Sequence, residues 1–190
     1  MSPIEVERKR ELPDSGEALR SRLAELGYRQ HGTFTEIDTY YSPRHVDYLE
    51  TVECLRVRQR DGFAEITYKP ASDESTHSTT DVIAKVETNV LLAGAEQAEA
   101  ANRLMTCTGM VTLARVEKAR TLYRHPKHDD VAVAIDTIGS LGAFVETEIT
   151  AVDESGVGLL EEIERELDLS GYPVVTLPYR DLVRAATIRT

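Results

Sequence analysis

The chain has 190 residues, of which 41% are hydrophobic and 29% are charged, and its formal net charge at pH 7 is −11. This length suits one domain with a sizeable core, and we expect a single domain over residues 1–190. The negative charge argues against a general nucleic-acid binder, whose affinity depends on basic contacts to phosphates. No stretch approaches the roughly 18 apolar residues of a membrane helix, so we expect no membrane partner.

Cysteine content and the N-terminal residues indicate the compartment. Cys54 and Cys107 are the two cysteines, and they lack CxxC spacing. This predicts neither a disulfide framework nor a zinc site. An apolar run followed by a small-residue cleavage site is absent, so no secretory signal is predicted. We therefore expect a cytoplasmic protein.

The first half of the chain is dominated by alternating apolar and polar residues, which predict strands. Asp14 and Glu17 resemble a capping box before a helical pattern. Asp61-Gly62 supplies the positive φ of a tight hairpin. The polar stretch 71–81 is interpreted as a lid or a disordered loop, and composition favours disorder. The predicted elements are a strand over 3–11, a helix over 16–27, a strand over 33–42, and two strands within 52–70.

The second half combines strands with helices whose apolar residues recur at spacings of three and four. The predicted elements are a strand over 82–90, a helix over 94–109, strands over 113–124, 131–139 and 143–152, and helices over 156–169 and 177–186. The sum is eight strands, largely antiparallel. We therefore predict an α+β fold, a closed eight-stranded antiparallel β-barrel with flanking helices.

Charged residues recur at every second position on nearly every predicted strand. Glu5, Glu7 and Lys9 share one face of the first strand, and Arg56 and Arg58 share a face of another. A sheet with one solvated face gives such alternation without any function. A solvated face, however, usually mixes Thr, Ser, Gln and Lys. We therefore interpret the charged faces as the inner wall of the barrel and the apolar faces as covered by helices.

Charges inside a barrel need water, counter-charges or a ligand, because unpaired buried charge is costly. Basic residues suit a polyanion, since Arg binds phosphate oxygens with two donors and Lys acts as a point charge. Carboxylates beside them favour a divalent metal ion that is shared with phosphates. The basic set is Lys9, Arg56, Arg58, Lys69, Lys85, Lys118 and Arg120, and the acidic set is Glu5, Glu7, Glu87, Asp136, Glu146 and Glu148.

Eight short motifs in order along the chain resemble a known family. "EVERK" is similar to the ExExK signature of the CYTH superfamily, the triphosphate tunnel metalloenzymes. "DTYY", "LRVR", "TYK", "KVE", "EKAR", the Asp of "AID" and "FVETE" continue the resemblance over nearly the whole chain. It implies one CYTH domain, an eight-stranded antiparallel barrel whose tunnel binds a triphosphate with Mg²⁺ or Mn²⁺. Pairing of two copies as a homodimer is implied as well.

The resemblance also implies roles for individual residues. The residues implied to bind metal are Glu5, Glu7, Glu146 and Glu148, with Asp136 and Glu87 close by. The residues implied to bind phosphates are Lys9, Arg56, Arg58, Lys69, Lys118 and Arg120, with Lys85 at a less uniform position. The residues expected to carry the catalysis are Glu5, Glu7, Lys9, Arg56, Arg58, Glu146 and Glu148.

Two enzymatic activities and one binding role stay open. Residues 37–70 are most similar to the class IV adenylate cyclase-like branch, which implies conversion of ATP to cyclic AMP and pyrophosphate. The His-Phe pair that precedes ExExK in the cyclase signature is absent. The alternative is an inorganic tripolyphosphatase or a thiamine triphosphatase, which would release orthophosphate from tripolyphosphate or thiamine triphosphate. A noncatalytic triphosphate-binding module would have lost the acidic set, which this chain retains.

Overall fold

A computed structural model describes residues 4–71, 82–151 and 156–188 of the chain. All but the first residue of the predicted loop 71–81 therefore lies outside the described residues. The chain divides into two compact units, each of which combines several segments. Unit 1 contains Met1–Thr33, Glu74–Val86 and Ala119–Thr176, and unit 2 contains Phe34–Asp73, Glu87–Lys118 and Leu177–Thr190.

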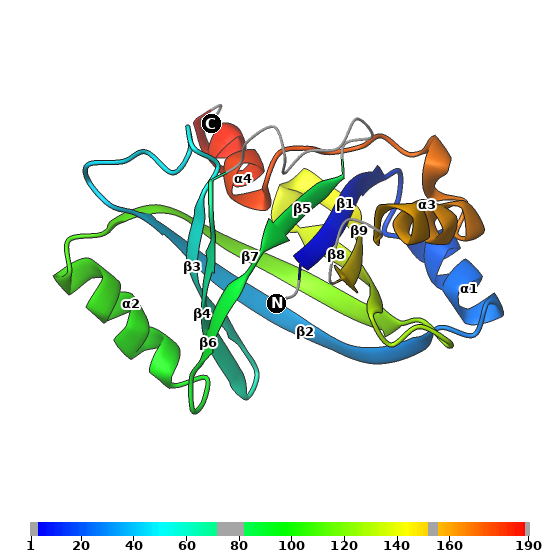
Figure 1. Cartoon of the computed structure of the whole chain (residues 1–190), viewed down its shortest axis with the longest axis horizontal. Coiled ribbons are helices and arrows are strands. Elements are labelled where there is room, and N and C mark those ends of the chain that lie inside the picture. Colours follow the sequence, from blue (N-terminus) through cyan, green and yellow to red (C-terminus); the bar gives the residue numbers. More distant parts are fainter. Residues whose placement is uncertain (1–3, 72–81, 152–155, 189–190) are drawn as a thin grey trace. The chain divides into compact units, whose positions relative to one another are not determined.

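The described residues form nine strands and four α-helices. Figure 1 labels these elements and colours them along the sequence. The strands are β1 (Ile4–Leu12), β2 (Arg29–Ser42), β3 (Cys54–Arg60), β4 (Phe63–Lys69), β5 (Ile83–Val86), β6 (Thr88–Leu91), β7 (Val111–Arg124), β8 (Val131–Ile138) and β9 (Gly142–Ala151). The helices are α1 (Glu17–Glu25), α2 (Gln97–Cys107), α3 (Gly156–Glu166) and α4 (Tyr179–Ile188), with short 3-10 helices η1 (Gly139–Leu141) and η2 (Leu169–Gly171). No described helix is both long and apolar enough to span a membrane.

The strands follow the order β5-β1-β9-β8-β7-β2-β3-β4-β6, and the pairs whose registers are resolved are antiparallel. The outer strands β5 and β6 are separated in the chain by Glu87 alone, so the chain itself joins the two edges of the sheet. This confirms the predicted antiparallel β-barrel class. The predicted count of eight strands was one too low, because the predicted strand 82–90 is two strands that pair with β1 and with β4.

In unit 1, helices cover the apolar side of β1, β8 and β9. Val6 on β1 packs in one buried cluster with Leu19 and Leu23 of α1 and with Leu160 and Ile163 of α3. Figure 1 shows α3 beside β1 and β9. This confirms that the apolar side of the first strand lies beneath helices. Burial of a side chain such as Leu160 stabilises the unit by about 1.5–3 kcal/mol.

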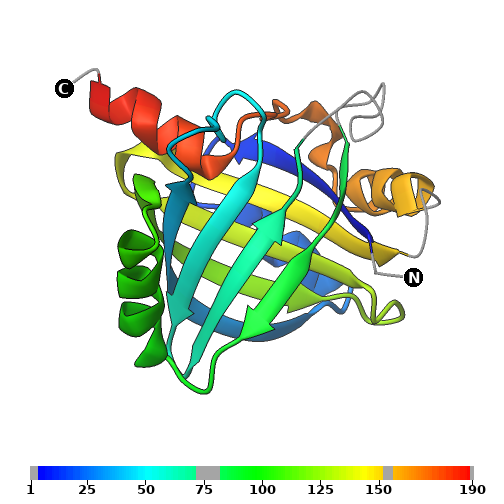
Figure 2. The ribbon, with the colours of Figure 1, turned by 60° about the vertical axis from the view of Figure 1, so that its left-hand side comes forward.

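In unit 2, β3 and β4 form the predicted hairpin, and α2 packs against both strands. Gly62 has φ 67°, the left-handed conformation that the turn requires and that glycine adopts without steric cost. Ala98 and Ala101 of α2 are buried against Val57 and Ala64. Figure 2 shows β3, β4 and β6 side by side, in agreement with their pairing.

The start of α1 differs from the predicted capping box. The residue before the helix is Gly16, in the left-handed conformation with φ 84°, and no side chain caps the helix. The Asp14 carboxylate instead accepts a hydrogen bond from the Gly16 amide at 2.6 Å. Asp14 therefore stabilises the turn before α1, two residues ahead of the capping position, because the chain turns sharply at Gly16.

Candidate functional site

The two central strands of unit 1 bring the first group of predicted site residues together by their register. Glu7 lies opposite Glu148, and Lys9 lies opposite Glu146, where β1 pairs with β9. The Lys9 ammonium is 3.9 Å from a carboxylate oxygen of Glu146. At the other edge of β1, where it pairs with β5, Glu5 lies opposite Lys85. The alternating acidic and basic positions of β1 therefore face neighbours from the predicted set.

A buried arginine connects two of the predicted acidic residues of unit 1. Arg120 on β7 lies opposite Asp136 on β8, and its Nε and Nη2 donate hydrogen bonds to Asp136 Oδ1 and Oδ2 at 2.7 and 2.5 Å. Arg120 Nη2 also donates to Glu146. Asp136 is fully buried, so this ionised pair is shielded from water. Such two-donor pairs fix the orientation of both groups.

In unit 2, Arg58 is held by two acidic residues of β2. Asp38 lies opposite Arg58 in the β2–β3 register and accepts hydrogen bonds from Arg58 Nε and Nη2, both at 2.7 Å. A Glu36 carboxylate oxygen is 3.3 Å from Arg58 Nη2. Both carboxylates are about 1% exposed. Asp38 and Glu36, both in the same unit, therefore compensate the charge of Arg58 and fix its orientation.

Arg56, two residues earlier on the same face of β3, is held differently. Its guanidinium nitrogens are 3.5 Å from Glu87, 3.8 Å from Glu65 and 3.9 Å from Asp38. Among the described residues, its buried Nε has no hydrogen-bond partner. Arg56 is thus surrounded by negative charge without the short donor–acceptor pairs of Arg58.

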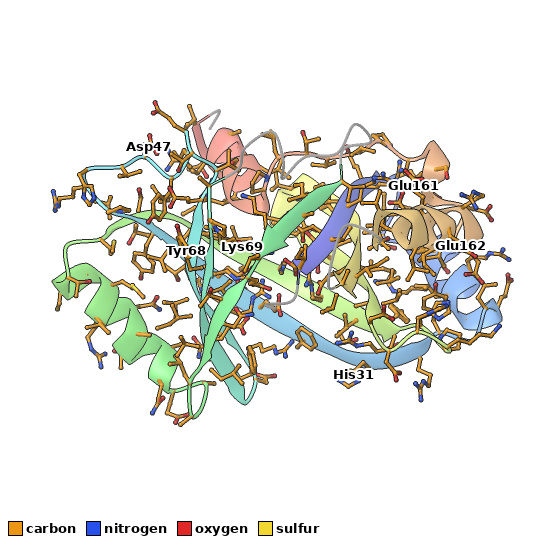
Figure 3. All side chains as sticks on the ribbon, viewed as in Figure 1. His31, Asp47, Tyr68, Lys69, Glu161 and Glu162 are labelled. Atoms are coloured by element: carbon orange, nitrogen blue, oxygen red, sulfur yellow. The ribbon has the colours of Figure 1, made fainter. Side chains whose placement is uncertain are left out.

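The lysines of unit 2 complete its basic set. Lys69, labelled in Figure 3, is 3.8 Å from Glu87, the carboxylate that also lies near Arg56. Lys118 is 3.3 Å from Glu36, and its ammonium lies 5.0 Å from the centre of the Tyr179 ring. Lys118 is only 3% exposed, so its charge acts within a medium that screens weakly.

Burial and the surrounding cations act in opposite directions on Asp38. Burial alone would raise the pKa of the Asp38 carboxyl, but the charge and hydrogen bonds of Arg58, helped by Arg56, hold this pKa well below its ordinary value. Burial, with the adjacent Asp38 charge, raises the pKa of Tyr40. Asp38 is therefore ionised and Tyr40 neutral near pH 7. Neither group is poised to exchange a proton there.

The predicted residues thus form two sets, each described within its own unit. Unit 1 contains Glu5, Glu7, Lys9, Lys85, Arg120, Asp136, Glu146 and Glu148, and unit 2 contains Arg56, Arg58, Lys69, Glu87 and Lys118. The prediction missed Glu36, Asp38 and Glu65, the carboxylates around the unit 2 arginines. Glu36 and Asp38 are spaced by two on one predicted strand, a signal that could have added them to the acidic set.

A second charged cluster, on the helix-covered side of β1, was also missed. Arg8 Nη1 donates to Glu164 of α3 at 2.5 Å, and Arg10 donates to the same carboxylate from Nε and Nη2 at 2.9 and 2.8 Å. Glu164 is 2% exposed. The alternation had indicated an apolar outer face for this strand, and Arg8 and Arg10 depart from it.

The carboxylates of unit 1 suit a divalent metal ion by their chemistry. Glu7 and Glu148 lie opposite each other in the β1–β9 register, and Mg²⁺ is usually held by one or two carboxylates with phosphate and water ligands. No three His, Cys, Asp or Glu side chains within residues 4–71, 82–151 and 156–188 are already clustered as a metal site. By their chemistry, these carboxylates would suit a metal ion whose coordination is completed by phosphate oxygens and water.

Comparisons with known proteins identify the fold family. MJ0240 of Methanocaldococcus jannaschii, provisionally named an adenylate cyclase, is 28% identical over 184 residues, covering 94% of this chain and 98% of that protein. PH1012 of Pyrococcus horikoshii is similar in structure with a TM-score of 0.76 and 23% identity, covering 94% of this chain and 98% of that one. HpAC1 of Hippeastrum, an adenylyl-cyclase-like protein described as having a dominant triphosphatase activity, has a TM-score of 0.69 and 16% identity, covering 97% and 96%.

The structural likenesses show the fold, and the sequence comparison adds the family. The model of the CYTH domain family matches residues 3–175. This range includes every predicted site residue from Glu5 to Glu148 and all nine described strands. The chain belongs to the CYTH domain family.

Proposed function

We propose that this chain is a divalent-metal-dependent enzyme that converts ATP to cyclic AMP and pyrophosphate. The observation that carries the proposal is the opposed pair Glu7 and Glu148, found in one chain with a cationic set that contains Arg56 and Lys69. Opposed carboxylates suit a metal ion, and closely spaced cations suit a polyphosphate. Membership of the CYTH family and the provisional name of the archaeal relative support this reaction class.

The residues of each unit have separate roles in this proposal. In unit 1, the carboxylates of Glu5, Glu7, Glu146 and Glu148 would hold Mg²⁺ or Mn²⁺, with Asp136 in the same unit and Glu87 in unit 2 as further acidic groups. When bound, the metal ion supplies charge neutralisation of phosphate oxygens. The side chains that would bind the phosphates directly are Lys9, Arg56, Arg58, Lys69, Lys85, Lys118 and Arg120.

The cationic side chains would act mainly by positioning and charge stabilisation. In the cyclase reaction, the ribose 3′-oxygen forms a bond to the α-phosphorus as the bond to the pyrophosphate oxygen breaks, and the hydroxyl proton is lost. Negative charge accumulates on the leaving pyrophosphate, where Arg and Lys donors stabilise it. Arg56 suits this task because the three carboxylates nearest its guanidinium lie 3.5–3.9 Å away, and Lys69 shares one of them, Glu87.

A triphosphatase is the second candidate. The description of HpAC1 as having a dominant triphosphatase activity favours this alternative, because a cyclase-like chain of the same fold hydrolyses its substrate there. Water would then attack the terminal phosphorus of tripolyphosphate or thiamine triphosphate, the bond from that phosphorus to the bridging oxygen would break, and orthophosphate would form as pyrophosphate or thiamine diphosphate leaves. The same cations and carboxylates serve both reactions, so the position of the phosphates relative to the nucleophile decides between them.

A product assay tests the proposal. The purified chain is incubated with ATP, tripolyphosphate or thiamine triphosphate, each with Mg²⁺ and with Mn²⁺. Cyclic AMP and pyrophosphate in equal amounts support the cyclase, and orthophosphate supports the triphosphatase. Binding of all three compounds without turnover would contradict an enzymatic role and indicate a binding module.

The proposal also includes the cellular compartment and the oligomeric state of the chain. We expect the chain to work in a reducing cytoplasm, which the two free thiols Cys54 and Cys107 support. We also expect a homodimer, on the family resemblance alone. Light scattering of the purified chain at several concentrations measures this second expectation.

A further inference from the structure

We infer that Asp38 is a positioning residue that fixes Arg58, and that Arg56 beside it is the guanidinium left available to an incoming phosphate. This inference rests on the proposed triphosphate site and deepens it. It divides two arginines with the same sequence pattern into a fixed donor and an exchangeable donor. It also gives a role to the aspartate of the "DTYY" stretch.

The contacts of Arg58 are those of a fixed group. Asp38 lies directly opposite Arg58 across the β2–β3 pair and accepts from both Nε and Nη2 at 2.7 Å. This parallel two-donor arrangement sets the plane of the guanidinium. Asp38 is about 1% exposed, so water does not compete for its oxygens. Arg58 Nη1 takes no part in the two bonds to Asp38, so it is the donor that this arrangement leaves for a ligand.

The contacts of Arg56 are those of an available group. Tyr40, a neutral phenol, is opposite Arg56 in the register, where Arg58 has an aspartate. The three carboxylates near Arg56 lie 3.5–3.9 Å away, too far for hydrogen bonds of normal geometry. A buried donor without a partner costs free energy that a phosphate oxygen would recover. Arg56 therefore gains more from a phosphate than Arg58 does.

The carboxylates near Arg56 and those near Arg58 also differ in their exposure to solvent. Glu87 is 18% exposed and lies near both Arg56 and Lys69, so a polyphosphate can take its place beside these cations. Glu36 and Asp38 are about 1% exposed and are surrounded by Arg58 and Lys118. When a polyphosphate binds, it would thus replace Glu87 beside Arg56 and Lys69. Glu36 and Asp38 would keep their contacts with Arg58 and Lys118.

The test is a double-mutant cycle on tripolyphosphate binding, measured by isothermal titration calorimetry. The variants are Asp38→Asn, Arg58→Gln and the double variant, with Asp129→Asn, at an exposed position, as the matched control. Asp38→Asn should weaken binding about tenfold or more, because a misplaced Arg58 is lost to the ligand. In the Arg58→Gln background the same change should cost less than about threefold, since the residue through which Asp38 acts is gone.

A conservative variant separates positioning from folding. Asp38→Glu keeps the charge and should restore part of the affinity lost in Asp38→Asn, with all variants folded at the assay temperature by circular dichroism. If Asp38→Asn does not fold, Asp38→Glu and Arg58→Lys form the cycle instead, and the same non-additivity is expected. Additive losses, or wild-type affinity in Asp38→Asn, would overturn the inference.

The wild-type measurement keeps the two proposals distinct. Tripolyphosphate binding no tighter than orthophosphate binding in the unmodified chain would contradict the proposed function itself. Tight wild-type binding together with unaffected Asp38→Asn binding would contradict only the role of Asp38.

Discussion

Glu7 and Glu148 lie directly opposite each other where the first and ninth strands pair. The Cβ atoms of opposed residues in an antiparallel pair are roughly 4.5–5.5 Å apart, and like charges at such positions are destabilising. A divalent cation between the carboxylates would offset this repulsion. We therefore expect a bound divalent cation to stabilise this pair.

We expect Glu148→Gln and Glu7→Gln each to lower metal-dependent turnover of the triphosphate by about 100-fold or more, since an amide is a weaker ligand for Mg²⁺. Without metal, each variant should be as stable as the unmodified chain, or more stable by about 0.2–1 kcal/mol. Steady-state rates and urea unfolding measure the two effects. Glu11→Gln, at an exposed position of the same strand, is the control. Full activity in both variants would refute the metal assignment.

Arg56→Ala should weaken triphosphate binding much more than monophosphate binding. A hydrogen bond to a charged group contributes about 1.5–3 kcal/mol, so the triphosphate affinity should fall by roughly 10- to 150-fold. A monophosphate uses fewer of the cations and depends less on any one of them. Calorimetric titration with tripolyphosphate and orthophosphate measures both losses. Arg115→Ala, at a side chain that is 55% exposed, is the control, and equal losses for both ligands would argue against the assignment.

Glu164→Gln should destabilise unit 1 by about 3–5 kcal/mol, because two buried guanidiniums would lose their shared carboxylate. Glu164 is 2% exposed and accepts from Arg8 and Arg10. Glu161, labelled in Figure 3, lies on the same helix but is 41% exposed and 3.8 Å from Arg8. Glu161→Gln should therefore change the free energy of unfolding by less than about 1 kcal/mol. Similar values for the two variants, from urea unfolding, would contradict this account.

His125 should make stability fall as the pH is lowered. Its Nδ1 accepts hydrogen bonds from the amides of Lys127 and His128 at 3.0 and 3.1 Å, which requires an unprotonated Nδ1. Burial and the nearby His128 lower the pKa of His125 below its ordinary value of 6.5, although Glu166 opposes the shift. The unfolded chain then binds more protons than the folded chain. The contribution is complete above pH 6.5 and is lost as the pH falls toward the lowered pKa.

Urea unfolding at pH 8 and pH 5 measures this contribution. His125→Asn, whose side-chain oxygen can accept from the same amides without titrating, should reduce the decrease in stability between the two values. His31→Asn changes an exposed histidine and should leave the decrease unaltered. An equal decrease in all three proteins would exclude His125 as its source.

The strands were predictable because alternation is a local property of the chain. The hairpin at Gly62 and the charged faces of β1 and β3 follow from residues that are neighbours in sequence. The extra strand was not predictable, because alternation continues unbroken through Glu87 while the pairing partner changes from β1 to β4. Sequence periodicity contains no information about the partner strand.

The residue types of the site were predictable from the sequence, but their surroundings were not. Arg56 and Arg58 could be identified as cations on one face, but their different environments depend on what lies opposite them in β2. Asp38 faces one and Tyr40 faces the other only because of the exact register of that pair. The Arg10–Glu164 contact joins residues 154 positions apart, so no local pattern could indicate it.

The cluster of Arg8, Arg10 and Glu164 also fixes the register of β1. A strand that is polar on both faces has little to prevent it from slipping by one residue, and such a slip moves every side chain to the opposite face. After a slip, Lys9 would lie beneath α3 and Arg8 would enter the face that Glu7 now occupies. Only the native register allows both Arg8 and Arg10 to bind Glu164. These contacts on the helix-covered face of β1 therefore determine which carboxylates lie on its opposite face.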